Sequence, residues 1–288
     1  MPSIYGEKIH VSIFGQSHSA AIGVVIDGLP AGVKIDMAEL GRFMARRAPG
    51  QGKYATARKE ADLPEFVSGV VDDVTCGAPV CALIRNTDTH SGDYANLRDV
   101  PRPSHADYPA YVKFGAAHDI RGGGHFSGRL TAPLCIAGGI ALQMLRARGV
   151  SIGAHIASVG SVNDARFDAV NVSTSDFDKI AANGFPVLDW QAGEKMLAEI
   201  ESARADADSI GGTIECAAVG LPAGLGDALF GGLEGRMSMA LFGVPAVKGV
   251  EFGNGFDCAT LCGSQNNDSF VIENGKIKTL TNNAGGIL

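Results

Sequence analysis

The stretch Arg-Gly-Gly-Gly-His-Phe-Ser-Gly-Arg, residues 121–129, organises the rest of the chain. Three consecutive glycines allow positive φ angles and a close approach of backbone to ligand, and exposed N–H groups in such a turn form an anion-binding nest. Arg121 and Arg129 place a guanidinium at each end. The apolar run 134–145 predicts a helix, so the loop leads into a helix N-terminus, where anions are favoured. The alternative is a glycine turn before a buried helix, with two surface arginines.

Composition limits the classes of protein that the chain can be. It has 288 residues and is 45% hydrophobic, enough for a large core in one or two domains. A net charge of −7 argues against general affinity for nucleic acid. No run of 18 uncharged apolar residues predicts a membrane span, and residues 1–8 lack a signal-peptide pattern. These features indicate a cytoplasmic protein.

The cysteines show neither a Cys-x-x-Cys pair nor zinc-binding spacing. They are therefore predicted to be buried free thiols in a reducing compartment. The six are Cys76, Cys81, Cys135, Cys216, Cys258 and Cys262.

A histidine follows the first predicted strand. Residues 9–14 alternate as a strand and run into Gly-Gln-Ser-His-Ser, which places Ser17 and His18 at the strand end. A histidine on such a rigid element is positioned like a catalytic group. The alternative is a capped turn with an exposed histidine. A second strand is predicted at 23–27.

A basic cluster surrounds the end of the first predicted helix, residues 36–47. Asp36 and Glu39 have capping-box spacing at its start. The helix dipole explains Arg46 and Arg47, but not the basic residues of the following loop. We therefore expect a local anion-attracting patch. Its members are Arg42, Arg46, Arg47, Lys53, Arg58 and Lys59.

A second histidine lies in a long segment without clear periodicity, residues 90–115. It follows predicted paired strands at 65–71 and 80–86. A structureless loop of this length in a compact domain is usually functional. Arg102 supplies positive charge, and His105 is a candidate acid or base that Asp107 could orient.

The pentapeptide Gly-Leu-Pro-Ala-Gly occurs twice, at 28–32 and 220–224, each time after a strand and before a helix. This repeat predicts two related halves with a pseudo-two-fold axis.

Asp206 and Asp208 are assigned to a solvated helix end rather than a metal site, because calcium-type ligand spacing is absent. The other predicted elements are helices at 131–148, 176–183, 194–205 and 226–241, and strands at 151–159, 213–219 and 248–252.

These motifs, taken together, resemble the chorismate synthase family. The resemblance rests on F-G-Q-S-H at 14–18, R-R-x-P-G at 46–50, R-P-S-H-A-D-Y at 102–108, R-G-G-G at 121–124, S-I-G-G at 209–212, A-V-K-G-V-E at 246–251, G-S-Q-N at 263–266 and N-x-A-G-G-I at 282–287. The motifs occur in family order and span essentially the whole chain.

The resemblance implies a fold and a reaction. The fold is α+β, a layered β-α-β sandwich with two related halves in a single large domain, residues 1–288. The family usually assembles as a homotetramer. The reaction is the 1,4-anti elimination of phosphate from 5-enolpyruvylshikimate 3-phosphate, which gives chorismate for aromatic amino acid biosynthesis. It requires reduced FMN, and NADPH is a possible external reductant.

The resemblance also implies roles for individual residues. His18 and His105 are the catalytic histidines, near the leaving phosphate and the flavin, and Ser17 and Ser127 lie beside them. Substrate anions are bound by Arg47, Arg121 and Arg129. FMN contacts fall at 125–127, that is His125, Phe126 and Ser127, and at Ala246. Arg47 and Lys53 match positions linked to NADPH or to a substrate anion, and no metal is expected.

Two departures from the family leave an alternative open. Many members carry Arg-Ser where this chain has His125 and Phe126, and Phe126 is a candidate to stack on the isoalloxazine. The family's C-terminal segment, which holds FMN, is absent, so we expect a chain truncated relative to the family. The alternative is thus a non-catalytic remnant or flavin-binding oligomer. A flavin reductase would need a nicotinamide site, and no G-x-G-x-x-G context supports one.

Overall fold

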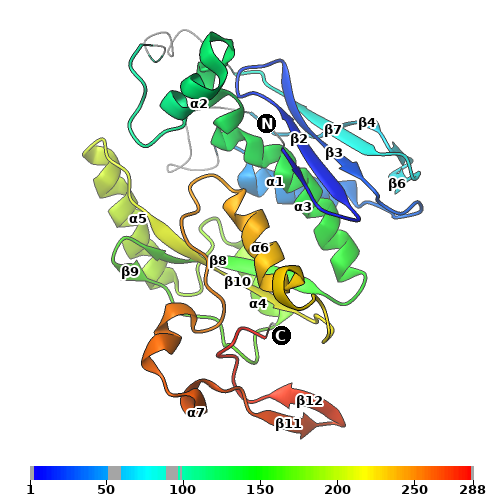
Figure 1. Cartoon of the computed structure of the whole chain (residues 1–288), viewed down its shortest axis with the longest axis vertical. Coiled ribbons are helices and arrows are strands. Elements are labelled where there is room, and N and C mark those ends of the chain that lie inside the picture. Colours follow the sequence, from blue (N-terminus) through cyan, green and yellow to red (C-terminus); the bar gives the residue numbers. More distant parts are fainter. Residues whose placement is uncertain (1–2, 51–59, 89–96, 98, 287–288) are drawn as a thin grey trace. The chain divides into compact units, whose positions relative to one another are not determined.

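The computed structural model describes residues 3–50, 60–88, 97 and 99–286 (Figure 1). The chain divides into two compact units. Unit 1 comprises residues 1–144 with 244–246, and unit 2 comprises residues 145–243 with 247–288. Both units combine antiparallel sheets with helices, which confirms the predicted α+β class. That residues 1–288 form one domain stays a prediction.

Unit 1 is built on a five-stranded antiparallel sheet with the order β1-β2-β3-β7-β4. Its central strand, β3, buries Ile22, Val24 and Ile26, as alternate residues of a strand with one face on a core should. The strands are β1 (Ile4–Tyr5), β2 (His10–Gly15), β3 (Ala21–Asp27), β4 (Glu65–Ser68) and β7 (Val80–Arg85).

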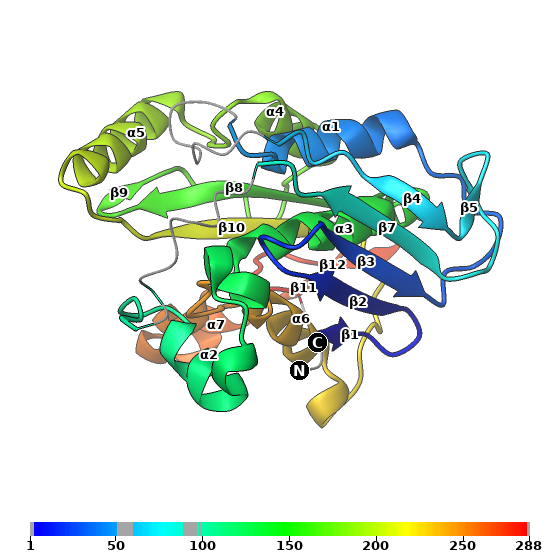
Figure 2. The same cartoon turned by 90° about the horizontal axis from the view of Figure 1, so that it is seen from above.

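Two helices, α1 (Met37–Arg47) and α3 (Thr131–Arg146), cover one face of this sheet (Figures 1 and 2). Leu40 and Met44 of α1 and Ile136 and Ile140 of α3 are buried in the same core as the strands. Among the described residues, one helical stretch, Gly128–Arg146, is long and apolar enough to cross a membrane. Half of it is buried inside the protein, as expected of a core helix.

The predicted capping box of α1 is only half formed. The side chain of Asp36 accepts a hydrogen bond from the Glu39 backbone N–H at 2.8 Å. The Asp36 N–H, however, donates to Oε1 of Gln143 on α3, also at 2.8 Å. A tertiary contact has therefore replaced the local bond that the sequence spacing predicts.

The predicted strand 65–71 is interrupted at Gly69. A Cβ at this glycine, which has φ +82°, would lie 2.5 Å from the Cα of Val80. The chain then forms a small hairpin of β5 (Val70–Val71) and β6 (Val74–Thr75), which turns through Asp72 and Asp73, both at positive φ.

The segment 90–115, predicted to lack regular structure, contains a helix. Within its described part, α2 (Asp107–Phe114) begins at Asp107 and is followed by the 3-10 helix η2 (Gly115–Ala117). Residues 89–96 and 98 lie outside the described residues. Two further 3-10 helices, η3 (Arg121–Phe126) and η4 (Gly128–Leu130), connect this region to α3.

Unit 2 is built on a three-stranded antiparallel sheet with the order β10-β8-β9. The strands β8 (Ser151–Val159) and β10 (Gly212–Val219) confirm predicted strands, and β9 (Val162–Asn163) extends the sheet. Two helices pack against it, α4 (Thr174–Ala182) and α5 (Trp190–Ala205). Asp206 is the C-cap of α5, in agreement with the predicted helix end.

Two predicted elements of unit 2 are corrected. The helix predicted at 226–241 begins only at Leu233, because residues 229–231 form a separate 3-10 turn, and residues 248–252 do not form a strand. The remaining elements are η5 (Leu229–Gly231), α6 (Leu233–Phe242), η6 (Gly255–Thr260), α7 (Gly263–Asn266), β11 (Phe270–Glu273) and β12 (Lys276–Thr279).

The repeated pentapeptide has the same backbone environment in each unit. Gly28 and Gly220, at φ +84° and +81°, follow β3 and β10. A Cβ on Gly28 would lie 2.2 Å from the carbonyl oxygen of Lys8, and one on Gly220 would lie 2.1 Å from that of Gly149. Only glycine fits either position, so the repeated sequence forms the same kind of glycine turn in each unit.

The cysteines are free, as predicted, but they are not buried. Cys76, Cys216, Cys258 and Cys262 are exposed, and Cys81 and Cys135 are half-buried. The prediction of burial was wrong because cysteine composition reports on pairing and not on which face of an element the side chain occupies.

Candidate active site

The glycine loop of residues 121–129 adopts the left-handed conformation that its sequence predicts. Gly122, Gly123 and Gly124 have φ angles of 59°, 83° and 57°, which interrupt η3. Ser127 then caps η4, because its Oγ accepts a hydrogen bond from the Arg129 N–H at 3.3 Å. The loop therefore passes directly into the N-terminal end of α3.

His18 lies against the first of these glycines. A Cβ on Gly122 would lie 2.3 Å from Cε1 and 2.4 Å from Nδ1 of His18. The neighbouring Ser17 is buried, and its N–H donates to the Gly124 carbonyl at 3.0 Å. Glycine at position 122 is thus needed both for the backbone angle and for the space that His18 occupies.

His105 lies against the second glycine. A Cβ on Gly123 would lie 3.1 Å from Cε1 of His105 and 3.8 Å from a terminal nitrogen of Arg102. Two histidines from segments far apart in the sequence therefore contact consecutive glycines of one loop, and all of these residues belong to unit 1.

Asp107 orients His105, as the sequence suggested. Its Oδ1 lies 2.8 Å from Nδ1 of His105, and its carboxylate is almost completely buried. Arg102 forms two side-chain hydrogen bonds to the same carboxylate, at 2.8 and 2.9 Å. This pairing with Arg102 holds the pKa of Asp107 well below its usual range.

The ionised carboxylate selects one form of the His105 ring. A carboxylate can only accept a hydrogen bond, so Nδ1 carries a hydrogen and donates it to Asp107. Arg102 also approaches Nδ1, at 3.2 Å, but cannot donate to a protonated nitrogen. Nε2 is then the ring nitrogen that is not committed to Asp107, on a side chain that is 34% exposed.

Arg121 lies at the solvent side of the loop and pairs with Asp119. Its Nε and Nη2 contact the two carboxylate oxygens at 2.8 and 3.0 Å. This pairing, with a smaller effect of His18, lowers the pKa of Asp119. The Arg121 side chain is about half exposed, so it is accessible to an anion.

Arg47 and Arg129, the other predicted substrate arginines, meet at a buried carboxylate. Nη1 of each donates to Asp62, whose side chain is fully buried. Arg129 is itself buried and also pairs with Glu60 at 2.9 Å, whereas the side chain of Arg47 is 24% exposed. The two arginines therefore differ in their access to a ligand.

The predicted cofactor-binding residues differ in their surroundings. His125 and Phe126 contact other residues of the protein. The ring nitrogens of His125 contact the Gly15 carbonyl at 2.7 Å and the Ser3 hydroxyl at 2.6 Å. The Phe126 ring packs on Phe114 and His118. Ala246 has a positive φ of 70° in the segment 244–246 of unit 1. Lys53 lies outside the described residues.

The sequence did not single out Glu60, Asp62 or Asn86, which the structure places beside the predicted arginines. Asn86 accepts a hydrogen bond from Nε of Arg129 at 3.4 Å. The only sequence signal for the carboxylates was their position directly after a basic cluster, where opposite charges are expected to pair.

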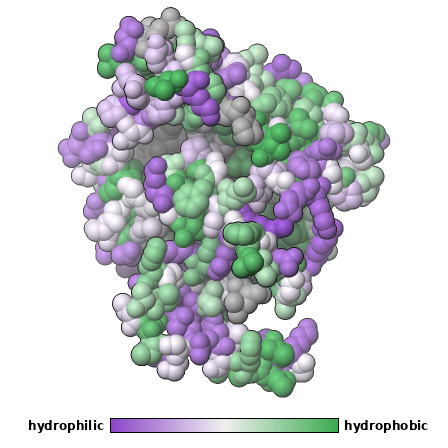
Figure 3. Space-filling model, viewed as in Figure 1, coloured by the Kyte–Doolittle hydropathy of each residue, from purple (hydrophilic) through white to green (hydrophobic). Residues whose placement is uncertain are grey.

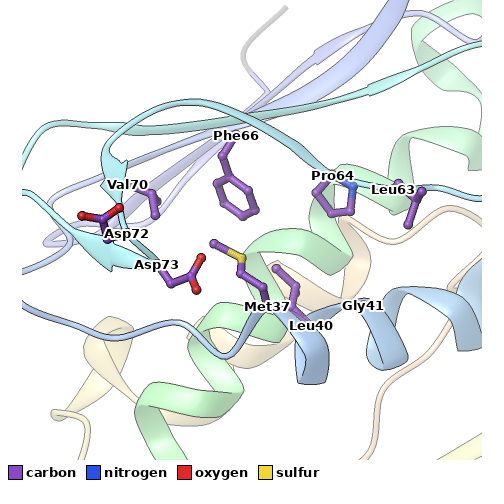
Figure 4. Close-up of a pocket in the computed structure, with 9 residues that line it drawn as sticks. All are labelled: Met37, Leu40, Gly41, Leu63, Pro64, Phe66, Val70, Asp72 and Asp73. Atoms are coloured by element: carbon purple, nitrogen blue, oxygen red, sulfur yellow. The ribbon is translucent and has the colours of Figure 1, made fainter.

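A surface cavity of about 560 Å³ lies elsewhere in unit 1, between the first half of α1 and the strands β4 and β5 (Figure 4). Its walls are apolar except at one end, where Asp72 and Asp73 lie. The lining residues are Met37, Leu40, Gly41, Leu63, Pro64, Phe66, Val70, Asp72 and Asp73. This lining is acidic rather than basic, so the cavity does not suit the anion that the arginines suggest.

Histidines that can exchange protons and arginines that can pair with phosphate or carboxylate are arranged around one glycine loop of an α+β scaffold. This combination suits an enzyme that acts on an anionic small molecule. The chain belongs to the chorismate synthase family, because the family model described as chorismate synthase matches residues 9–288.

Individual proteins agree with this assignment. The chorismate synthase of Lancefieldella parvula is 45% identical over 299 aligned residues, which cover 100% of this chain and 78% of that protein. The chorismate synthase of Thermococcus gammatolerans is 43% identical, covering 98% of this chain and 77% of that protein. A crystal structure of chorismate synthase superposes with a TM-score of 0.79 at 25% identity, covering 98% of this chain and 80% of that one.

Proposed function

We propose that the protein catalyses the reaction of its family, the conversion of 5-enolpyruvylshikimate 3-phosphate to chorismate and phosphate in aromatic amino acid biosynthesis. In this 1,4-anti elimination, the C–O bond to phosphate breaks and a ring proton leaves, with no net oxidation. The observation that carries the proposal is the convergence of His18 and His105 on Gly122 and Gly123, in a chain that matches the family over residues 9–288.

The two histidines are proposed to act at different points. His18, beside Ser17 and in the field of Asp119, donates a proton to the departing phosphate. His105 uses Nε2 at the cofactor, because Nδ1 is committed to Asp107. Ser127 is, with Ser17, one of the two serines proposed to lie beside the catalytic histidines. Its Oγ already accepts the Arg129 N–H, so its hydroxyl hydrogen remains available for a second partner.

The substrate carries a phosphate and two carboxylates, so its site needs fixed cations. Arg47 and Arg121 are proposed to contact these anions, because both side chains are partly exposed. Arg129 is proposed to contribute positive charge from a buried position.

Reduced FMN is the proposed cofactor and supplies an electron-rich ring. The chemistry of the available groups suits it: Nε2 of His105 and the partly exposed Arg102 present a hydrogen-bonding group and a cation beside the left-handed glycines. Contacts from Ser127 and Ala246 remain proposals, as does NADPH as external reductant at Arg47 and Lys53.

A cytoplasmic homotetramer is the proposed assembly, with no nucleic acid or membrane partner. Apolar side chains that face solvent on unit 2 support self-association. Phe230, Phe256 and Ile272 are 99%, 81% and 80% exposed, and hydrophobic residues gather over the hairpin β11–β12 (Figure 3).

The proposal is tested by anaerobic phosphate release from 5-enolpyruvylshikimate 3-phosphate, with FMN reduced chemically in the cuvette. We expect stoichiometric phosphate and chorismate, and no phosphate when FMN is left oxidised. Chemical reduction removes any requirement for NADPH, so the test concerns the elimination alone.

A folded protein that releases no phosphate would favour the second candidate, a non-catalytic remnant or flavin-binding oligomer. One observation favours that candidate specifically. His125 and Phe126, at two predicted FMN positions, are engaged by Gly15, Ser3, Phe114 and His118 instead. Flavin binding measured by fluorescence quenching would then distinguish a remnant that binds FMN from one that does not.

A further inference from the structure

A buried carboxylate, Asp62, links the two arginines that flank the candidate site. Its Oδ2 accepts from Nη1 of Arg47 at the end of α1, and its Oδ1 accepts from Nη1 of Arg129 before α3. The Asp62 side chain is fully buried. Two guanidiniums that would otherwise repel each other are thus held by one anion between them.

Glu60 fixes this arrangement from the other side of Arg129. Its Oε2 pairs with Nη2 of Arg129 at 2.9 Å. Its Oε1 accepts from the backbone N–H groups of Thr87 and Asp88, at 2.8 and 3.2 Å. Asp62 adopts a φ of +50°, a strained angle for a non-glycine residue that the surrounding contacts maintain.

Asn86 extends the same network to the turn that carries His18. Its Oδ1 accepts from Nε of Arg129, and its Nδ2 donates to the carbonyls of Gln16 and Ser19, at 3.1 and 2.8 Å. These two carbonyls bracket Ser17 and His18 in the sequence. The position of Arg129 is therefore tied to the His18 turn on one side and to Asp62 on the other.

Arg129 and Arg47 differ in what they can still bind. All three nitrogens of the Arg129 guanidinium group face protein partners, and the side chain is 4% exposed. Arg47 uses Nη1 for Asp62 and Nε for Thr131, the latter at 3.4 Å. Its Nη2 makes no hydrogen bond with any described residue, and the side chain is partly exposed.

We propose that Asp62 is a positioning residue, which aims the partly exposed Arg47 side chain at the phosphate or a carboxylate of the substrate, and that Arg129 holds Asp62 in place. The identity of the anion rests on the proposed function. Binding of an anion as such does not, because the geometry of the arginines is sufficient to attract one.

A competing role for Asp62 makes the opposite prediction. If Asp62 occupied the place of the ligand anion, removing its charge would open the site and tighten anion binding. If it aims Arg47, removing its charge releases the guanidinium, and anion binding weakens. The burial of Asp62 and near-complete burial of Arg129 favour the second role, because Arg47 is the more exposed of the two arginines that pair with Asp62.

The test is binding of inorganic phosphate, measured by titration calorimetry at constant ionic strength with chloride as the balancing anion. Asp62→Asn is expected to raise the Kd for phosphate about tenfold, since one well-aimed charge-assisted contact is lost. The matched control is Glu65→Gln, which also removes one negative charge from unit 1, from the exposed pair with Arg85. Its Kd is expected to stay within about twofold.

Turnover gives a second readout. In Asp62→Asn, KM for the phosphorylated substrate should rise about tenfold while kcat changes less than about threefold, because binding geometry rather than proton transfer is affected. A purely structural role would lower the amount of folded protein and leave both the phosphate Kd and KM unchanged.

An unchanged or tighter phosphate Kd in folded Asp62→Asn overturns the proposal, as does a wild-type protein that binds no phosphate. If Asp62→Asn does not fold, Asp62→Glu keeps the charge but displaces it by one methylene. Weaker phosphate binding in that variant supports the proposal, and an unchanged Kd refutes it. Wild-type protein that binds phosphate but performs no elimination removes the proposed reaction and leaves this inference intact.

Discussion

His105 in unit 1 and His155 in unit 2 each pair with a buried aspartate, yet their surroundings differ. Nδ1 of His155 lies 2.9 Å from Asp164, and its Nε2 lies 2.8 Å from Glu215, so both ring nitrogens face carboxylates. The His155 side chain is completely buried, whereas that of His105 is 34% exposed, with only Nδ1 committed to Asp107.

This difference separates a structural histidine from one that can do chemistry. A ring with both nitrogens occupied can hold two segments together but cannot exchange a proton with a ligand. A ring with one nitrogen fixed and the other near an opening is oriented and available. Pairing with aspartate alone therefore does not mark a histidine as a catalytic candidate; its second nitrogen must also be available to a ligand.

The largest loss of kcat is expected when Gly122, which lies against the His18 ring, is replaced. In Gly122→Ala, the new Cβ would lie 2.3 Å from the His18 ring at a φ of +59°, so the ring must move. We expect kcat to fall at least about 100-fold, since displacements near 1 Å have that effect. Phosphate release under the anaerobic assay measures it.

Gly128→Ala in the same loop is the control, because a Cβ there meets nothing within 4 Å. Its kcat should remain close to that of the wild type. Equal kcat values for the two variants would show that the contact between His18 and Gly122 does not matter for turnover.

Replacing His155, whose ring nitrogens both face carboxylates, should lower the free energy of unfolding rather than kcat. His155→Leu leaves the carboxylates of Asp164 and Glu215 without their shared hydrogen-bond partner, and leaving buried acceptors unsatisfied in this way costs about 1–3 kcal/mol. The free energy of unfolding in urea should fall by about that amount, while kcat of the folded fraction stays unchanged. His10→Ala, at an exposed histidine, is the control. A selective loss of kcat in His155→Leu would contradict the comparison.

A pH-dependent effect on stability is expected at Asp107. Arg102 holds the pKa of Asp107 below its unfolded value of about 3.9, so the unfolded state binds more protons and stability rises with pH through that range. Asp107→Asn should cost about 1–3 kcal/mol at neutral pH. The cost should shrink as the pH falls below about 4, toward the folded pKa.

Urea unfolding of the wild type and Asp107→Asn at several pH values between about 7 and 3 measures this trend. Asp178→Asn, at an exposed position of α4, controls for the loss of one negative charge. A difference in unfolding free energy that does not change with pH would contradict the prediction, because it would mean that the ionised form of Asp107 does not stabilise the folded state.

Local features of the fold were predictable from the sequence. The strand at 151–159, the helix ending at Arg47 and the positive φ angles of 122–124 follow from apolar periodicity and glycine placement, which act within a few residues. The segment 65–71 and the helix predicted from 226 were less accurate, because a bend at Gly69 and a separate turn at 229–231 interrupt patterns that read as continuous.

Long-range partners were not predictable in the same way. Composition and spacing could not indicate that Asp62 would meet Arg129, 67 residues later, or that Gln143 would take the Asp36 N–H. The short spacing of His105 and Asp107 did suggest their contact, which the structure contains at 2.8 Å. The predicted FMN contacts of His125 and Phe126 came from the resemblance to the family, which does not specify the direction of either side chain in this chain.

The most direct measurement of the central claim is the turnover of His105→Ala in the anaerobic phosphate-release assay, compared with its Kd for inorganic phosphate. We expect kcat to fall by about 100-fold or more, as for loss of a general acid or base, with a Kd within about twofold of the wild type, because His105 is assigned to the cofactor side of the site. Near-normal turnover in folded His105→Ala would contradict the assignment of chemistry to the histidine that Asp107 orients.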